Sequence, residues 1–284
     1  MITLNELCIY KVSVVILYYN DPHIKLVLQS ISAQTKLPDE VIIIDDHSNT
    51  PLNTNDIGSS LILRIHRNNT NKGRGYSRNL GLKLSKHDFV LFCDSSNSLC
   101  KTFIEESLKV LLQNDATAVF GRIVGDPQFI NPLNKWRERN LFLQSHPKLA
   151  TPYEVNSLSS YSTLLKKANV EDVGGFNKDL VQYEDHELGE RLLINNYKIL
   201  FHPLLYCISN KNDNLFQLAT RIDRWYSPTS QFFNLSSFYT LIKTSICIWI
   251  KRDFESKDYC GVIISLLIPY IVLYQNITYA FRKN

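Results

Sequence analysis

The sequence predicts an α/β protein in which helices flank a mostly parallel sheet and a helical extension follows at the C-terminus. Three observations favour this class. Runs of aliphatic and β-branched residues at 12–17, 41–44 and 89–92 have the length of strands buried on both faces. Segments with helical spacing separate them, as in parallel crossovers. An uncharged tract at 259–281 indicates a helical element of a different kind.

The composition describes an ordered globular protein with a mild positive charge. The 284 residues suffice for one large domain or two joined ones, and 44% of them are hydrophobic against 20% charged. The net charge of +4 suits a protein that handles phosphorylated ligands or touches an anionic membrane. It is too weak to indicate nucleic-acid binding, so no nucleic-acid partner is expected.

Six cysteines stand at irregular spacings without a C-x-x-C pair. This pattern predicts buried, reduced thiols of a cytosolic protein, and it favours neither a disulfide framework nor a zinc site. Residues 1–11 include the acidic Glu6 and lack the basic start and apolar core of a secretory signal, so a cytoplasmic protein is expected. The cysteines are Cys8, Cys93, Cys100, Cys207, Cys247 and Cys260.

Helix signals follow the first strand. Asp21 before Pro22 predicts an N-cap with proline at the first helical position, and apolar spacing carries that helix to Ile31. Polar residues at 49–60 predict a loop. The same patterns predict further strands at 61–65, 116–120 and 161–165 and a helix at 102–112.

An acidic crevice is expected where the parallel strands end. Asn20 comes after the first strand, Asp45 and Asp46 after the second, and Asp94 after the fourth. Open parallel sheets bind ligands outside the carboxyl ends of their strands. These four side chains are therefore expected to line one crevice.

The stretch from Gly174 to Arg191 combines a predicted bend with a carboxylate pair. Two adjacent glycines favour a tight turn, and Phe176 is expected to anchor that turn in the core. Glu184 and Asp185 stand where helical spacing begins. Acids at a helix start are favoured by the helix dipole, so an ordinary capping role and a catalytic role both stay open.

Two other segments allow more than one interpretation. In the irregular stretch 122–152, Trp136 to Asn140 is either a mobile substrate loop or a solvated face, and the sequence favours the solvated face. The tract 259–281 is long enough to span a bilayer, but polar residues and tyrosines interrupt it. This favours helices lying at a membrane interface, with a buried core helix and a true span as alternatives.

Four motifs appear in order: VSVVILYYN, VIIIDDHS, NKGRGYSRNLG, and GGF followed by ED. Together they resemble the family 2 nucleotide-sugar glycosyltransferases, which have the Rossmann-like GT-A fold, over residues 12–203. The resemblance implies a glycosyltransferase domain at 1–206, with a nucleotide-binding half at 12–97 and an acceptor half at 98–206. Residues 207–284 are then expected to form a helical region that associates with a membrane.

The resemblance also implies donor-binding residues. Asp46 is expected to accept the N–H of the nucleotide base, and the alternative is an aspartate that turns a loop. Arg78 is expected to contact the diphosphate, and the alternative is a surface cation. The donor residues implied are Tyr19, Asn20, Asp46, Gly73, Arg78, Asn79, Asp94 and Ser96, together with Asn71.

Similar enzymes invert the anomeric carbon in one displacement, which implies a carboxylate base. That role falls on Asp185, with Glu184 beside it. A divalent ion, Mn²⁺ or Mg²⁺, usually neutralises the leaving diphosphate through a D-x-D motif. Here the motif is Asp94-Ser95-Ser96, and serine is a weaker ligand than a carboxylate.

A metal site of Asp94 and His202 remains an expectation, and a histidine packed in the core is the alternative. Without a metal, Arg74, Arg78 or a C-terminal cation must supply the positive charge. Arg221 to Trp225 resembles the Q-x-x-R-W motif of processive members with its glutamine replaced, which makes Arg224 and Trp225 candidate contacts of acceptor or diphosphate. The alternative is an amphipathic helix with a buried tryptophan.

The sequence thus predicts an inverting glycosyltransferase of hexosyl type that uses a nucleotide-diphosphate sugar, a UDP-sugar in particular. Its expected acceptor is a hydroxyl of a glycan or lipid-linked molecule in surface polysaccharide or glycoconjugate synthesis, and its expected place is the cytoplasm, peripheral to the membrane. Two other classes stay open. One is an inactive relative that binds a nucleotide sugar or a partner, and the other is a soluble enzyme acting on a protein or peptide.

Overall fold

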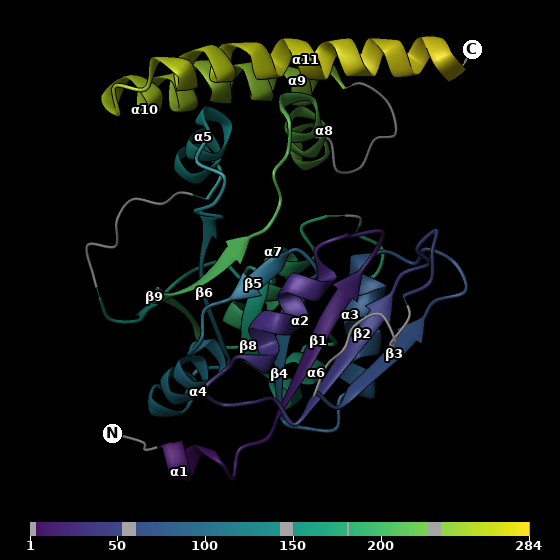
Figure 1. Ribbon diagram of the computed structural model, residues 1–284, viewed down its shortest axis with the longest axis vertical. Helices are drawn as coiled ribbons and strands as arrows, with labels where there is room; N and C mark the ends of the chain where they lie inside the picture. Colours follow the sequence, from purple (N-terminus) through teal and green to yellow (C-terminus); the bar gives the residue numbers. More distant parts are fainter. Residues whose placement is uncertain (1–3, 53–60, 143–149, 181, 227–233, 284) are drawn as a thin grey trace. The chain divides into compact units, whose positions relative to one another are not determined.

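The computed structural model describes residues 4–52, 61–142, 150–180, 182–226 and 234–283. It confirms the α/β class, with a central sheet flanked by helices and a helical C-terminal region (Figure 1). The chain forms two compact units. The first contains residues 1–124 and 147–210, and the second contains 125–146 and 211–284. The functional boundaries at residues 206 and 207 stay a prediction.

The first half of the sheet is parallel, as the crossovers predict. Hydrophobic runs form β1 (Val12–Tyr18), β2 (Glu40–Asp45), β3 (Leu63–Arg67) and β4 (Phe89–Asp94), which pair in the order β3-β2-β1-β4. The parallel register aligns Tyr18 with Asp45, and Leu17 with Asp94. The carboxyl ends of β1, β2 and β4 therefore lie at one edge.

The second half of the sheet runs antiparallel to its neighbours. β8 (Ser162–Lys166) pairs antiparallel with both β4 and β6 (Ala118–Gly125). The order continues through β9 to β5, and β7 pairs with β9 off this path. These three strands are β5 (Asn97–Leu99), β7 (Tyr153–Glu154) and β9 (Ile199–Ser209).

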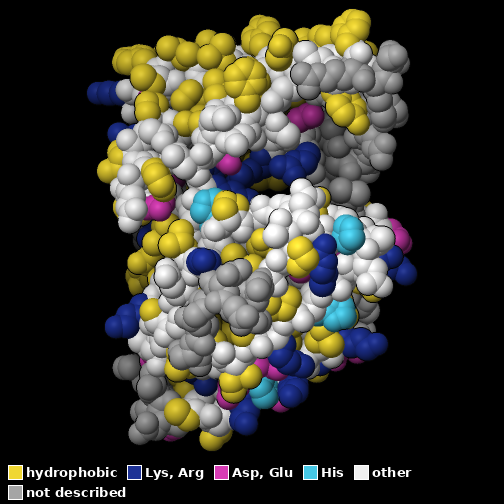
Figure 2. All heavy atoms as spheres, turned by 45° about the vertical axis from the view of Figure 1, so that its right-hand side comes forward, with side chains coloured by type: hydrophobic (Ala, Val, Ile, Leu, Met, Phe, Trp, Pro, Cys, Tyr) yellow, Lys and Arg dark blue, Asp and Glu magenta, His cyan; other side chains and the backbone are white. Residues whose placement is uncertain are grey.

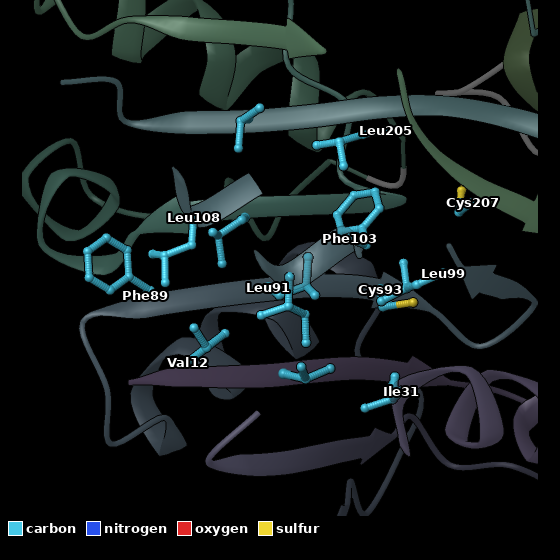
Figure 3. Packing of buried hydrophobic residues seen from close by; sticks show 14 of the residues in the cluster. Val12, Ile31, Phe89, Leu91, Cys93, Leu99, Phe103, Leu108, Leu205 and Cys207 are labelled. Atoms are coloured by element: carbon cyan, nitrogen blue, oxygen red, sulfur yellow. The ribbon is translucent and has the colours of Figure 1, made fainter. Parts of the chain in front are cut away.

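Helices cover both faces of the sheet because alternate strand residues point to opposite faces. One core holds Val14 and Ile16 with α2 (Ile24–Ser32) and α4 (Phe103–Gln113), and Figure 3 shows part of it. The opposite core holds Val15 and Phe176 against α3 and α7. The remaining helices of this unit are α1 (Leu4–Leu7), α3 (Arg74–Leu84), α6 (Lys167–Asp172) and α7 (Glu184–Ile194).

Two local predictions were wrong, the first in this unit and the second in both units. The helix after β1 begins at Ile24 and not at Pro22, because the Asp21 carboxylate accepts the His23 backbone N–H at 3.0 Å and forms a turn first. All six cysteines are free, but Cys8, Cys247 and Cys260 are exposed, so buried thiols were predicted correctly for only half of them.

The second unit consists of packed helices. Its members are α5 (Pro132–Asn140), α8 (Leu215–Tyr226), α9 (Leu235–Thr244), a π-helical turn at Ser245–Trp249, α10 (Ile250–Glu255) and α11 (Tyr259–Lys283). The loop of Ser256 to Asp258 is short, so α10 and α11 form an antiparallel hairpin. Figure 1 shows α9 and α10, which follow one another through the π-helical turn, lying along α11, with α5 and α8 against one side of this layer.

The solvated face expected at Trp136 to Asn140 was wrong. Trp136 is fully buried, its indole N–H donates to Ser265 Oγ at 2.7 Å, and its ring meets Trp249 edge to face at 5.0 Å. Arg137 and Asn140 are buried as well. A helix that starts at a capping Asn131 and packs one side on α11 explains this burial.

Candidate active site

Asp46 organises the loop that enters α3. Its carboxylate accepts the backbone N–H groups of Lys72 at 2.8 Å and Gly73 at 2.9 Å, and the side-chain amide of Asn68 at 2.7 Å. Gly73 has φ +83°, a conformation that favours glycine. Each carboxylate oxygen has two lone pairs, so Asp46 retains capacity to accept a further N–H. In the structure, Asp46 holds the loop before α3 in place. Its contact with the nucleotide base stays a prediction.

Tyr19 and Asn20 follow β1 at the same edge. Asn20 has φ +49°, its backbone N–H donates to Ser48 Oγ at 2.9 Å, and its side-chain oxygen accepts the Asn49 N–H at 2.8 Å. Tyr19 is half exposed. Asn20 therefore ties the end of β1 to the loop after β2, while the Tyr19 ring is available to a ligand.

Asp45 does not line the crevice, contrary to the prediction. It is almost completely buried, and its carboxylate pairs with Arg67 at 2.5 Å and accepts the Ser48 N–H at 2.8 Å. The reason is the strand period, because residues 45 and 46 are adjacent and face opposite directions. Asp45 supports the sheet edge from within.

Arg78 joins the two acids at the centre of the site. Its guanidinium donates to Glu184 in a short hydrogen bond and lies 3.7 Å from Asp94, and its charge lies over the Phe176 ring at 5.4 Å. Arg74 approaches Glu184 at 3.6 Å. Arg78 and Glu184 are buried, whereas Asp94 and Arg74 keep 41% and 49% of their side chains exposed. The surface-cation alternative for Arg78 is therefore wrong.

α7 begins at Glu184 and Asp185, as its spacing predicts. Tyr183 precedes it with φ +63°, which is unusual for a bulky residue. The second carboxylate oxygen of Glu184 is buried and has no hydrogen-bond partner among the described residues. This arrangement exceeds what a helix cap needs and leaves an acceptor inside the site.

Asp185 is fixed by the segment before β8. One carboxylate oxygen accepts both the backbone N–H of Ser160 at 3.0 Å and its hydroxyl at 2.9 Å, and the other accepts the His186 N–H at 2.9 Å. Burial raises the pKa of Tyr161 well above its ordinary value, and the charges of Asp185 and Asp94 add to that rise. The Asp94 backbone N–H donates to the Tyr161 carbonyl at 3.0 Å, so the segment 160–161 contacts both Asp94 and Asp185.

Ser160 and Tyr161 are absent from the sequence-based candidates. β8 runs antiparallel to β4, which places Ser162 opposite Cys93 and the residues before it at the carboxyl end of β4. The sequence does not show that one strand of a sheet runs antiparallel to the others. It therefore contained no signal that Ser160 and Tyr161 lie in the site.

Asn79 clamps the glycine bend. Its amide nitrogen donates to the Phe176 carbonyl at 2.7 Å, and its oxygen accepts the Phe176 N–H at 2.8 Å. Gly174 and Gly175 have φ +88° and +73°, which confirms the predicted turn. Both the nitrogen and the oxygen of the Asn79 side-chain amide bond to this bend. Contact of Asn79 with the sugar donor stays a prediction.

The described residues do not fit the expected metal site. Ser96 is buried, and its carbonyl accepts the Asn210 N–H at 2.9 Å. Among the described part of the chain, no group of three or more His, Cys, Asp or Glu side chains stands ready to hold a metal ion. The Arg78 guanidinium lies 3.7 Å from the Asp94 carboxylate.

His202 lies away from Asp94. His202 belongs to β9, and the other end of that strand, Ser209, pairs with Asn97, three residues after Asp94. His202 is seven positions from Ser209 along the extended strand, a distance of about 23 Å. Its Nδ1 accepts the Leu204 N–H at 3.2 Å, and burial lowers the pKa of its imidazole. The core-histidine interpretation fits this position.

Arg224 and Trp225 belong to the second unit. α8 exposes Arg224 and packs the half-buried Trp225 against the core around Trp136 and Trp249. This packing matches the amphipathic-helix interpretation of the segment. Contact with acceptor or diphosphate stays a prediction for both residues.

Comparison with known proteins identifies the family. The family described as "Glycosyl transferase family 2" matches residues 13–174, which is more than half of the chain. The chain is 26% identical over 250 residues to poly-beta-1,6-N-acetyl-D-glucosamine synthase of Staphylococcus aureus, covering 82% of this chain and 56% of the relative. It is 26% identical over 168 residues to pre-mycofactocin glycosyltransferase of Mycobacterium tuberculosis, covering 58% and 36%.

Solved structures agree on the fold. Residues 1–349 of S. aureus TarS in complex with UDP-GlcNAc superpose with a TM-score of 0.56 at 20% identity, covering 85% of this chain and 79% of that one. The chain spans only about a third to just over half of the curated relatives it matches. The motif order, the GT-A architecture and the family match together show that this chain belongs to glycosyltransferase family 2.

Proposed function

We propose that the chain transfers a hexose from a nucleotide-diphosphate sugar to an acceptor hydroxyl with inversion, and that Asp185 is the general base. The acceptor oxygen attacks the anomeric carbon while Asp185 takes its proton, and the bond from that carbon to the diphosphate oxygen breaks. The nucleoside diphosphate leaves with the electron pair of that bond. The observation that supports this is the Asp185 carboxylate, which is partly buried and accepts two hydrogen bonds from Ser160 beside the Arg78 and Glu184 pair.

The leaving diphosphate needs positive charge. We propose that Arg74 supplies it, because its guanidinium is half exposed while Arg78 is buried against Glu184. Glu184 then acts by orienting the two guanidinium groups. A cation of the second unit, such as Arg224, is the alternative source.

The donor and acceptor classes rest on the relatives. TarS was solved with UDP-GlcNAc, which supports a UDP-sugar here. A relative named as a polysaccharide synthase supports a glycan or lipid-linked acceptor in surface polysaccharide synthesis. The proposed place of action is the cytoplasmic side of a membrane, and the six free cysteines, which suit a reducing compartment, support it. A protein or peptide acceptor remains the alternative.

A second candidate function is donor binding without turnover. Ser96, which stands where the family's usual metal-ligating acid is expected, supports it. Incubation with a UDP-sugar, with and without Mn²⁺, separates the two, because only an enzyme releases UDP. Binding shown by thermal shift with no UDP released would favour the binding protein.

Asp185→Asn tests the base. Turnover is expected to fall by about 10²–10⁴-fold, since amide nitrogen cannot take the proton. The thermal shift given by UDP is expected to remain, because the residues proposed to bind the donor are unchanged. Glu187→Gln on the same helix is the matched control. Turnover of Asp185→Asn equal to the control would reject Asp185 as base.

A further inference from the structure

One stripe of α11 is apolar and exposed along the whole helix. Its residues recur every three or four positions and lie on one side of the helix. More than half of the large hydrophobic side chains exposed among the described residues lie between 235 and 281, and Figure 2 shows hydrophobic side chains gathered over this layer. We call it the outer stripe: Tyr259, Ile263, Leu266, Tyr270, Tyr274 and Ile277.

The opposite side of α11 is fastened to other helices of the same unit. The hydroxyl of Ser265 donates to the buried Asp253 at 2.5 Å, near the start of α11. Eleven residues later, Asn276 donates to Asp223 of α8 at 3.0 Å. These two bonds lie about 16 Å apart along the helix axis.

These two hydrogen bonds argue against α11 as a transmembrane helix. Among the described residues, Tyr259–Phe281 is a helix that is long enough and apolar enough to cross a membrane. Inserting it would expose the buried Asp253 carboxylate to lipid. Because hydrogen bonds hold one side of α11 to α8 and α10, only its outer stripe is available to contact lipid. That geometry suits a helix lying in the plane of the interface.

The charge of this region suits an anionic surface. Residues 211–284 contain nine Lys and Arg against five Asp and Glu, which equals the whole net charge of +4. Four of the five acids pair internally: Asp253 and Asp258 with Arg139, Asp213 with Arg221, and Glu255 with Lys251 at 4.0 Å. Three lysines of this helical layer are exposed, Lys243 on α9, Lys251 on α10 and Lys257 in the loop before α11, and we call them the hairpin lysines.

We propose that the outer stripe and the exposed hairpin lysines dock this chain on an anionic lipid bilayer, with α11 in the plane of the membrane. Tyrosines suit this depth because their rings are apolar and their hydroxyls stay hydrated. The inference deepens the membrane location proposed above, and it does not depend on the chemistry of sugar transfer.

The test is vesicle flotation of the full chain with phosphatidylcholine vesicles and with vesicles containing phosphatidylglycerol. The wild type is expected to float with the anionic vesicles, and each lysine at the surface contributes roughly fivefold. The variant Ile263→Glu/Tyr270→Glu is expected to lose at least about tenfold in partitioning, because both exposed side chains leave the lipid. The matched control Ile194→Glu/Leu204→Glu changes two exposed hydrophobic residues of the first unit and is expected to float like the wild type.

Circular dichroism and the UDP thermal shift establish that each variant is folded, so a failed enzyme remains distinguishable from a failed membrane surface. Floating of the stripe variant at the wild-type level overturns the proposal. Resistance of the wild type to alkaline extraction also overturns it, in favour of a span. A wild type that ignores vesicles and forms dimers that the stripe variant abolishes overturns it in favour of self-association.

Discussion

Both units of the molecule contain buried acids paired with arginine, and two of these acids, Asp253 in the second unit and Glu184 in the first, differ in how many of their oxygens have partners. In the second unit, Asp253 accepts from Arg139 at 2.7 Å, from Asn140 at 2.9 Å and from Ser265 at 2.5 Å, so both of its oxygens have partners. In the first unit, Glu184 pairs with Arg78 through one oxygen, and its other oxygen has no partner among the described residues.

This difference separates a structural cluster from a ligand site. A saturated buried cluster contributes a single well-defined packing and has nothing left to offer a ligand. An unsatisfied buried acceptor is costly, and it persists where another requirement maintains it. We infer that the Arg78 and Glu184 pair is completed when the donor or acceptor binds, whereas both oxygens of Asp253 already have partners, although the Asn140 Oδ1 beside it has none among the described residues.

The largest expected effect comes from breaking the saturated cluster. Asp253→Ala leaves the Ser265 hydroxyl without its acceptor and Arg139 with Asp258 as its one remaining acid, and the free energy of unfolding is expected to fall by about 3–5 kcal/mol. All three tryptophans, Trp136, Trp225 and Trp249, belong to the second unit, so denaturation followed by tryptophan fluorescence reports on it. Asp258→Ala removes the more exposed partner of Arg139 and is expected to cost about 1 kcal/mol. Equal losses for the two variants would contradict the distinction.

Removing the charge of Glu184 is expected to lower turnover more than it lowers stability. Glu184→Gln keeps an oxygen that accepts from Arg78 but no longer balances the two guanidinium groups, so turnover is expected to fall about 100-fold. Unfolding followed by circular dichroism is expected to change less than for Asp253→Ala. Glu187→Gln, which breaks an exposed pair with Arg191, is the control and should stay within about twofold. Wild-type turnover in Glu184→Gln would make the pair structural.

The sequence predicted the parallel half of the fold well, because each strand there is a dense aliphatic run and each crossover carries its own helical spacing. Glu184 and Asp185 were found at the start of α7 for the same local reason. The antiparallel half was less visible, so Ser160 and Tyr161 were missed. The burial of Trp136 was also missed, because its partners Trp249 and Ser265 stand more than 100 residues away in the chain.

The glycine bend before the acids offers a finer comparison, because two adjacent glycines differ in their surroundings. A Cβ at Gly175 would meet the Asn79 side-chain oxygen at 2.7 Å, whereas nothing lies within 4 Å of one at Gly174. Both have positive φ, so alanine at either position is strained by about 1–2 kcal/mol. Gly175→Ala is expected to cost more than Gly174→Ala and to lower turnover, because it also disturbs the Asn79 clamp.

Unfolding and turnover of the two variants measure this difference. In the double variant Gly175→Ala/Asn79→Ala the clash is gone, so its loss of stability is expected to be smaller than the sum of the two single losses. Additive losses would show that Asn79 and Gly175 do not interact.

The smallest expected effect concerns His202, the histidine that the sequence linked to a metal. Burial lowers its pKa, so the unfolded chain binds a proton near pH 6.5 that the folded chain resists. Stability is therefore expected to fall as the pH drops below about 6.5, with a slope from this group of at most about 1.4 kcal/mol per pH unit. His202→Gln should remove that part of the slope, and the exposed His186→Gln should leave it unchanged. If His202 instead held a metal ion, Mn²⁺ would raise the thermal stability of the wild type and not of His202→Gln, and the core interpretation would be wrong.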